Sequence, residues 1–192
     1  METPVDPLQT SLLATLTERG LATSVELQQL TGKSQPTVSR ALRGLSKQLV
    51  TLGQGKRTRY GLPQAIRDLP AQQPLWWTDA QGRITRFGTL TLLAGGRVHV
   101  AAEGIDVLSR GQLPWFLAPL RLQGFLGREW ALRLGLDSSP ERWGLEQVLY
   151  AALRIDDHPG AISIGDIKGE PVPEAPADIG QRAAHYDTSP PT

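Results

Sequence analysis

The fold of the first third of the chain is decided by the stretch Ser34-Gln35-Pro36-Thr37-Val38-Ser39-Arg40-Ala41-Leu42-Arg43. Val38, Leu42 and Leu45 recur at helical spacing, which gives a helix one apolar face to bury. Ser34 is a residue type that caps helix N-termini, and Pro36 lies in the first turn, where a missing N–H breaks no helical hydrogen bond. The stretch therefore predicts a helix that begins at Ser34 and packs through one face.

The segments on either side extend this helix into a larger unit. Leucines at helical spacing over 8–16 predict a first helix, and residues 25–30 predict a short second one. Downstream, residues 49–52 and 57–60 have the composition of two strands joined by a glycine-containing turn. Three helices followed by a hairpin form a winged helix-turn-helix, which we expect over residues 1–65.

A helix of this kind can enter the major groove of DNA, which is about 12 Å wide. In a helix-turn-helix the N-terminal turns of the second helix face the base edges. Glutamine can pair with adenine and arginine with guanine, so Gln35 and Arg40 are the candidates for base readout. Basic side chains further along the helix and around the hairpin turn suit phosphates or the minor groove. The candidate DNA-binding residues are Gln35, Thr37, Ser39, Arg40, Arg43, Lys47, Lys56, Arg57 and Arg59.

The alternative is that these charges only solvate a helix and a hairpin, and the charge distribution favours DNA binding over it. Residues 1–67 hold nine Lys/Arg against four Asp/Glu, a net charge of +5. Residues 68–192 hold eleven against fifteen, a net charge of −4. A basic first third joined to an acidic remainder predicts that the first part meets a polyanion.

The remainder of the chain predicts a small α+β domain over 78–167, after a linker over 66–77 and before a disordered, proline-rich tail over 168–192. The fold class of the whole chain is therefore α+β. The expected elements are strands over 83–87, 89–93 and 97–101, the first two separated by Gly88, a helical stretch in two pieces over 113–136, and a helix starting with a capping-box pattern at 138–141.

The sequence lacks the groupings that catalysis or metal binding needs. His99, His158 and His185 are scattered, and there is no cysteine, so we expect neither a metal site nor a disulfide. No nucleophile is paired with a base, so we expect no catalytic residues and no cofactor. The N-terminus has no signal-peptide pattern, and no apolar run approaches the ~20 residues that span a bilayer. We therefore expect a soluble, cytoplasmic protein with no membrane partner.

Two groups of motifs carry a resemblance to known families. Gly32–Leu45 contains Ser-x-x-Thr-Val-Ser-Arg-x-Leu and resembles winged regulators of the MarR and IclR types. The second group comprises Arg86–Leu90, Gly95–Arg97, Leu113–Leu117, Gln123–Arg128 and His158–Ile162. On these motifs, residues 83–166 resemble the N-terminal subdomain of the HipA family, the serine/threonine-kinase toxins of bacterial toxin–antitoxin modules. A winged helix followed by this subdomain looks like the YjjJ branch of the family. One departure is Leu122, where proline is expected.

The HipA resemblance implies a kinase lineage, but we expect this chain to lack the kinase domain. HipA-family kinases continue well beyond the resembling part. Phosphoryl transfer by a protein kinase uses an asparagine that holds a metal ion, and this chain contains no asparagine. We therefore expect no kinase activity and classify the chain as a non-enzyme.

Three functions stay open. The first is a sequence-specific DNA-binding transcriptional regulator, the repressor or antitoxin part of a HipA-like toxin–antitoxin module. The second is a protein-interaction module that binds and restrains a separate HipA-like kinase, by analogy with split systems. The third is a truncated HipA-family kinase without activity. The expected partners are double-stranded DNA and, in the second case, a kinase chain; the operator sequence and the formation of a homodimer stay open.

Overall fold

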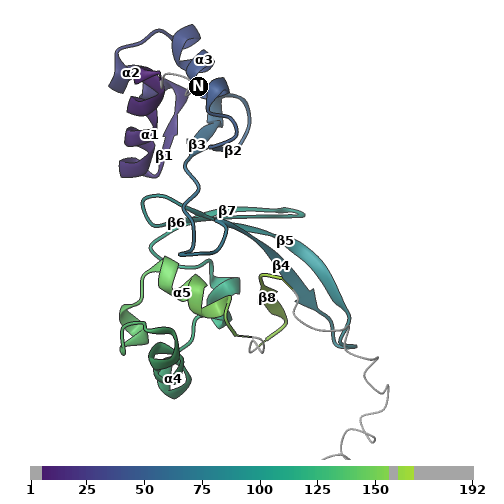
Figure 1. The fold of residues 1–192 in the computed structure, drawn as a ribbon. Helices are drawn as coiled ribbons and strands as arrows, with labels where there is room; N and C mark the ends of the chain where they lie inside the picture. Colours follow the sequence, from purple (N-terminus) through teal and green to yellow (C-terminus); the bar gives the residue numbers. More distant parts are fainter. Residues whose placement is uncertain (1–5, 156–159, 167–192) are drawn as a thin grey trace, which may run out of the picture.

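Two antiparallel sheets and the helices around them make up the part of the chain that the structure describes (Figure 1). The structure is a computed structural model, and it describes residues 6–155 and 160–166. The predicted α+β class is confirmed. The predicted disordered tail over 168–192 lies outside the described residues, as do His158 and His185.

The first unit, residues 6–62, is called the N-terminal unit below, and it combines three helices with a three-stranded sheet of order β1-β3-β2. The predicted helices and hairpin are present, together with a short strand, β1, that the sequence analysis missed. The elements in chain order are α1 (Pro7–Arg19), β1 (Leu21–Thr23), α2 (Ser24–Thr31), α3 (Gln35–Gly44), β2 (Val50–Leu52), a 3-10 turn (Gly55–Arg57) and β3 (Arg59–Gly61).

Local residue chemistry explains where these helices begin and end. A carboxylate oxygen of Asp6 accepts a hydrogen bond from the Leu8 N–H at 2.9 Å and so caps α1. Gly20, with φ at 78°, ends the same helix. Ser34 precedes α3 as predicted, but its hydroxyl bonds the hydroxyl of Thr37 at 3.0 Å instead of capping a backbone N–H. One apolar core holds the helices together, formed by Leu12, Leu16, Ala22, Leu27, Val38, Ala41, Leu42 and Leu45.

The N-terminus of α2 is closed by a capping box. The Glu26 N–H donates to the Thr23 hydroxyl at 3.2 Å, and the Thr23 N–H donates to the Glu26 carboxylate at 2.7 Å. The hydrogen bond from the Thr23 backbone is the largest cause that lowers the pKa of Glu26 below its ordinary value, and the Thr23 hydroxyl and the charges of Arg19 and Arg59 act in the same direction. The ionised carboxylate therefore stabilises the folded state.

This capping box predicts a specific loss of stability in acid. Because the pKa of Glu26 is lowered on folding, its contribution is present above the ordinary value of 4.5 and is lost as the pH falls through the lower folded pKa. Glu26→Gln should cost roughly 0.5 kcal/mol at pH 7, the usual effect of an exposed carboxylate at a helix N-terminus. In urea unfolding, the free energies of unfolding of the parent and of Glu26→Gln should therefore converge as the solution becomes acidic.

The control for this experiment is Glu18→Gln, which removes an exposed glutamate from the C-terminal part of α1. That variant should be as stable as the parent at pH 7 or slightly more so, because a carboxylate near a helix C-terminus opposes the helix dipole. Equal losses from Glu18→Gln and Glu26→Gln would contradict the role of the capping box.

The second unit, formed by the described residues between 66 and 166, is called the sheet unit below. Its five-stranded sheet has the order β7-β6-β5-β4-β8, with antiparallel pairs throughout. Its elements are β4 (Gln72–Thr78), β5 (Ile84–Leu93), β6 (Arg97–Ala102), β7 (Ile105–Arg110), a 3-10 helix (Trp115–Leu120), α4 (Gly124–Leu134), a 3-10 turn (Pro140–Arg142), α5 (Leu145–Ala152) and β8 (Ile162–Ile164).

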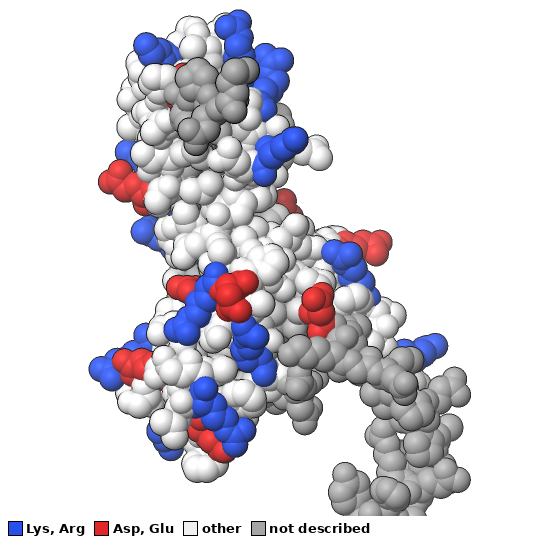
Figure 2. Space-filling view, viewed as in Figure 1, with Lys and Arg blue, Asp and Glu red and all other residues white. Residues whose placement is uncertain are grey.

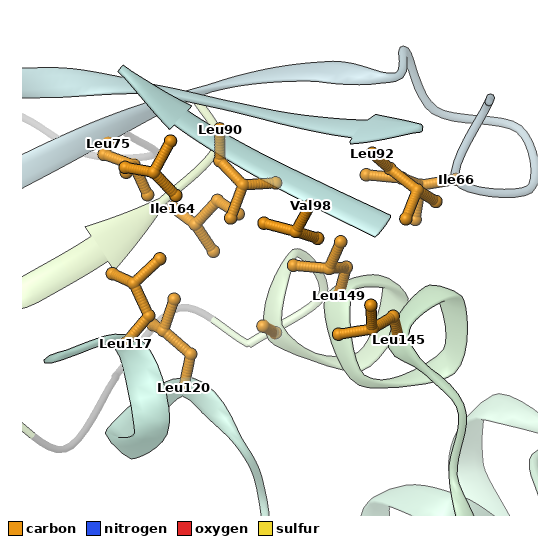
Figure 3. Packing of buried hydrophobic residues seen from close by; sticks show 12 residues of the cluster. Ile66, Leu75, Leu90, Leu92, Val98, Leu117, Leu120, Leu145, Leu149 and Ile164 are labelled. Atoms are coloured by element: carbon orange, nitrogen blue, oxygen red, sulfur yellow. The ribbon is translucent and has the colours of Figure 1, made fainter. Parts of the chain in front are cut away.

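One face of this sheet packs on α5 and on the 3-10 helix Trp115–Leu120 (Figure 3). Alternate residues of the strands point into this core, as expected for a sheet with one covered face. The fully or nearly fully buried members of the core are Ile66, Leu75, Leu90, Leu92, Val98, Val100, Leu117, Leu120, Leu145, Leu149, Ala152 and Ile164. α4 packs against α5 through a separate, smaller cluster that includes Ala131, Trp143 and Val148.

Much of the predicted linker over 66–77 is a strand in the structure, because β4 lies between β5 and β8. The prolines of this segment suggested a connection rather than a strand. The carbonyl oxygen of Pro74 accepts a hydrogen bond from the Gly165 N–H at 3.0 Å. Since the N–H and C=O of a strand residue point to the same side, the missing N–H of Pro74 faces the end of β8 and interrupts no bond to β5. The domain boundary therefore falls before residue 72.

Gly88 does not separate two strands as predicted, because β5 continues from Ile84 to Leu93. The register places Gly88 opposite Leu75 and Arg86 opposite Trp76, so Phe87 is the extra residue of a β-bulge. A Cβ atom at Gly88 would lie 2.6 Å from the carbonyl oxygen of Ala101. The glycine is needed for close contact with β6, not for a turn.

The helical predictions of the sheet unit are correct in part. The stretch 113–136 contains two pieces, and the second, α4, begins at Gly124 as predicted, but the first is a 3-10 helix. The predicted helix start at 138–141 is wrong, because residues 140–142 form one 3-10 turn and α5 begins only at Leu145. The Trp143 indole donates to the Asp137 carbonyl at 2.7 Å, and this contact holds the intervening turn.

The two units meet through backbone contacts at the end of β5. The Ala94 N–H donates to the Leu62 carbonyl at 2.8 Å, and the Gln64 N–H donates to the Leu92 carbonyl at 2.9 Å. Leu93 is fully buried and lies against Gly61. These contacts tie the chain that leaves β3 to the sheet and hold the N-terminal unit beside it (Figure 1).

Candidate nucleic-acid interface

The α2–α3 pair is positioned by the apolar core of the N-terminal unit. Leu27 of α2 and Val38 of α3 are both fully buried in that core. Gly32 ends α2 in the left-handed conformation, with φ at 64°, and reverses the chain toward α3. This leaves the side of α3 that points away from the core free to contact a ligand.

The exposed face of α3 lies opposite its buried residues. An α-helix turns about 100° per residue, so Pro36, Arg40 and Arg43 point away from the side that Val38 and Leu42 bury. Both arginines are exposed. The guanidinium groups therefore project from the middle of the free face, where they are available to a polyanion.

Of the remaining predicted residues of α3, Thr37 and Ser39 flank this face, whereas Gln35 lies in the first turn on the side of the helix that Val38 and Leu42 occupy further along. Gln35 and Thr37 are exposed, whereas Ser39 is half-buried. The hydroxyl of Thr37 is bonded to that of Ser34 and still has hydrogen-bonding capacity for a further partner. Lys47 follows the helix in an exposed turn. In Figure 2, Lys and Arg side chains lie along the upper right edge of the N-terminal unit, over α3 and the β2–β3 connection.

The β2–β3 connection is more structured than the simple turn that the sequence predicted. It contains the 3-10 turn Gly55–Arg57, which includes the backbone of Lys56. Gly53 has φ at 73°, and a Cβ there would lie 2.9 Å from the Arg57 carbonyl oxygen, so this glycine closes the loop. Arg57 and Arg59 are both exposed, on the loop and on β3.

Lys33 is a candidate that the sequence analysis missed. It is exposed and lies in the turn between α2 and α3, directly before the first residues of α3. Lys33 could have been identified from its position directly before the N-cap serine, because helix N-termini and lysines both favour anions.

Other kinds of site find little support within the described residues. They contain no group of three or more residues able to hold a metal ion, and no helix among them is long and apolar enough to cross a membrane. His99 is paired with Asp106 at 2.7 Å. A cavity of about 220 Å³ in the sheet unit is lined by Gly111, Gln112, Leu113, Ala118, Arg121, Gln123, Trp143, Leu145 and Val148, a set without a nucleophile or a general base.

Comparison with known proteins identifies the family of the chain. A family model described as "YjjJ-like toxin, middle domain" matches residues 69–170. The chain belongs to the YjjJ-like toxin family. Toxin YjjJ of Escherichia coli (strain K12) is 32% identical over 190 residues, an alignment that covers 92% of this chain and 42% of that protein. No solved structure matches the chain.

The family match locates the shared part of the fold. Residues 69–170 begin just before β4 and extend past β8, so they contain the whole five-stranded sheet. The alignment with Toxin YjjJ is long enough to include most of the N-terminal unit as well. The predicted resemblance to the YjjJ branch is confirmed at the level of the family. This chain spans less than half the length of the E. coli relative.

Proposed function

We propose that this YjjJ-family chain is a sequence-specific DNA-binding transcriptional regulator of a toxin–antitoxin module, and that its N-terminal unit is a winged helix-turn-helix. The observation that carries the proposal is the exposed face of α3. It presents Arg40 and Arg43 one turn apart, while the opposite face is buried, and Gln35 is exposed to one side at the helix N-terminus. A helix with this division of faces suits insertion into a major groove.

The proposed roles follow from side-chain chemistry. Gln35 and Arg40 read base edges, and Thr37 and Ser39 contact base edges or phosphates close to the N-terminus of α3. Basic side chains outside the groove neutralise phosphates and supply affinity that is independent of sequence. The proposed phosphate contacts are Lys33, Arg43, Lys47, Lys56, Arg57 and Arg59.

The experiment that tests this function is fluorescence anisotropy of the intact protein. One duplex carries the DNA upstream of the protein's own gene, and the other is a scrambled sequence of the same length and composition, each measured across a salt series. Tighter binding to the upstream duplex with a steep salt dependence is the expected result. Equal binding to both duplexes would remove the claim of sequence specificity, and no binding to either at low salt would remove DNA binding altogether.

The phosphate contacts of α3 give a separate prediction. Arg43→Ala combined with Lys47→Ala should weaken binding to both duplexes by similar factors, because phosphates carry no sequence information. The slope of log K against log salt should fall by about 2, close to one unit for each phosphate that is no longer neutralised. A weakening confined to the upstream duplex would instead assign these residues to base readout.

A second candidate function is binding to a separate HipA-like kinase chain, which the surface of α4 favours. Phe125 and Leu132 are 76% and 86% exposed and lie seven residues apart on one side of α4, away from the side that Gly127 and Ala131 bury. An apolar stripe of this kind suits a protein partner. Size-exclusion chromatography with a purified HipA-like kinase tests it: Phe125→Ser with Leu132→Ser should abolish co-elution, and retention of the complex would reject this surface.

The proposal extends to kinship and activity. We also propose that the chain is related to the HipA family and that it is located in the cytoplasm. A third part of the proposal is that the chain has no kinase activity. The lack of any asparagine supports the last of these, because a kinase catalytic loop holds a metal ion through that residue type. Turnover of ATP that survives repeated purification would overturn the non-enzyme part of the proposal.

A further inference from the structure

A groove lies between the β2–β3 connection of the N-terminal unit and the edge of the five-stranded sheet. Its volume is about 390 Å³, and it is open to solvent on one side. Residues of β2, β3 and their connection form one wall, and residues of β6 and β7 form the other. The lining residues are Leu52, Gly53, Arg57, Arg59, His99, Asp106 and Leu108.

The two walls are held in place by the junction between the units. Besides the backbone bonds at Leu62 and Gln64, Nη2 of Arg97 donates to the carbonyl oxygen of Arg19 at 3.4 Å. That carbonyl belongs to the last residue of α1, where a cation also interacts favourably with the helix dipole. The groove is therefore part of a fixed arrangement of the two units.

The groove joins two cations on one wall to an imidazole on the other. Arg57 and Arg59 supply guanidinium groups, which donate hydrogen bonds in a fork that matches phosphate oxygens. On the facing wall, His99 Nε2 lies 2.7 Å from a carboxylate oxygen of Asp106. The His99 side chain is only 12% exposed, whereas that of Asp106 is 69% exposed. Asp106 accepts from Nε2–H and orients the ring, so Nδ1 can donate to an anion when the imidazole carries both protons.

We propose that this groove binds a phosphate group between Arg57 and Arg59 on one side and His99 on the other. The charges favour an anion, because the two arginines outnumber the one carboxylate among the lining residues. The phosphate can be a phosphodiester of bound DNA, an assignment that rests on the proposed function, or a free phosphate. In the first case the sheet unit contributes directly to the DNA interface.

Asp106 provides the sharpest test, because its removal should improve binding. Asp106→Asn deletes a negative charge from the groove, while the amide oxygen can still accept a hydrogen bond from His99. One unit charge about 6 Å away in a water-like dielectric changes affinity roughly threefold, so we expect tightening by about that factor. A gain in affinity cannot result from partial unfolding. His99→Ala should weaken binding by a similar factor, and Arg57→Ala with Arg59→Ala should weaken it more.

Each variant is measured with two probes, inorganic phosphate by isothermal titration calorimetry and the upstream duplex by anisotropy. The control is Arg128→Ala, which removes an exposed positive charge from α4, outside the groove. Opposite shifts for the Asp106 and His99 variants with the duplex assign a DNA phosphate to the groove. If the two variants shift affinity in opposite directions with inorganic phosphate but not with the duplex, the ligand of the groove is a free phosphate.

The outcomes separate this inference from the proposed function. If the parent binds the duplex but neither groove variant differs from Arg128→Ala with either probe, the groove proposal fails and DNA binding stands. If the parent binds no duplex while inorganic phosphate binding follows Asp106 and His99, the groove stands and the DNA-binding proposal fails.

Discussion

Arg40→Ala should weaken binding to the upstream duplex by roughly 1–3 kcal/mol, which is about a five- to 150-fold decrease in affinity, and should relax discrimination at one base pair. The reason is geometric. Arg40 is exposed in the middle of the α3 face that lies opposite Val38 and Leu42, so in the proposed complex its guanidinium meets a base edge rather than the backbone. The measurement is anisotropy with the upstream and scrambled duplexes, followed by a set of single base-pair substitutions.

Arg40→Lys is the matched variant for this prediction, because it retains the charge and removes the planar fork of donors. If Arg40 clamps a guanine, the lysine variant should recover binding to the scrambled duplex but not the preference for the upstream one. Full recovery of both by lysine would reduce Arg40 to a phosphate contact. An alanine variant that discriminates as well as the parent would exclude Arg40 from base readout and leave Gln35 as the remaining candidate.

The helices of the N-terminal unit could be predicted because their information is local. Val38, Leu42 and Leu45 occur at helical spacing and are buried, as the spacing requires. β1 carried no such signal, since three residues are too few to show an alternation. Leu21–Thr23 form a strand because β3 lies alongside with Thr23 opposite Arg59 and Leu21 opposite Gly61. That pairing joins residues far apart in the chain, which no local pattern reveals.

The same limit explains the errors in the sheet unit. β4 contains Pro74 and follows Pro70, so its composition resembles a connection, yet its apolar Leu75 is fully buried in the core. β8 is three residues long and joins the sheet only by pairing with residues 75–77 of β4. Both strands are stabilised by non-local pairing and burial, which outweigh weak local propensity.

The residues of the candidate site could be predicted only where the pattern in the sequence is local. The exposed residues of α3 could be predicted because the buried face of a helix determines its opposite face. The groove could not, because His99 and Asp106 lie on β6 and β7 while Arg57 and Arg59 lie in another unit. In the sequence, His99 is an isolated histidine with no spacing that suggests a partner. Its position beside the β2–β3 connection depends on the junction between the units.

Gly20→Ala should disrupt that junction and lower the free energy of unfolding by roughly 3 kcal/mol. Gly20 has φ at 78° and ψ at −39°, a conformation outside the left-handed helical region that residues with a Cβ atom avoid. A Cβ atom there would also collide with the carbonyl oxygen of Ala94 and approach Nε of Arg97 to 2.9 Å. Because the Ala94 carbonyl is backbone in the tight turn after β5, the two units have to move apart to relieve the collision.

Gly32→Ala is the control for a positive φ without a collision. Gly32 has φ at 64° and ψ at 17°, in the left-handed helical region, and a Cβ atom there would meet nothing within 4 Å. This variant should therefore show only the conformational cost, about 1 kcal/mol. The larger loss expected for Gly20→Ala in urea unfolding combines the collision between the units with the less favourable backbone conformation of Gly20. Calorimetry should show two transitions for Gly20→Ala where the parent shows one. Equal destabilisation at the two glycines, with one transition each, would mean that the contact between the units adds no measurable stability. The contact would then not hold the two walls of the groove together.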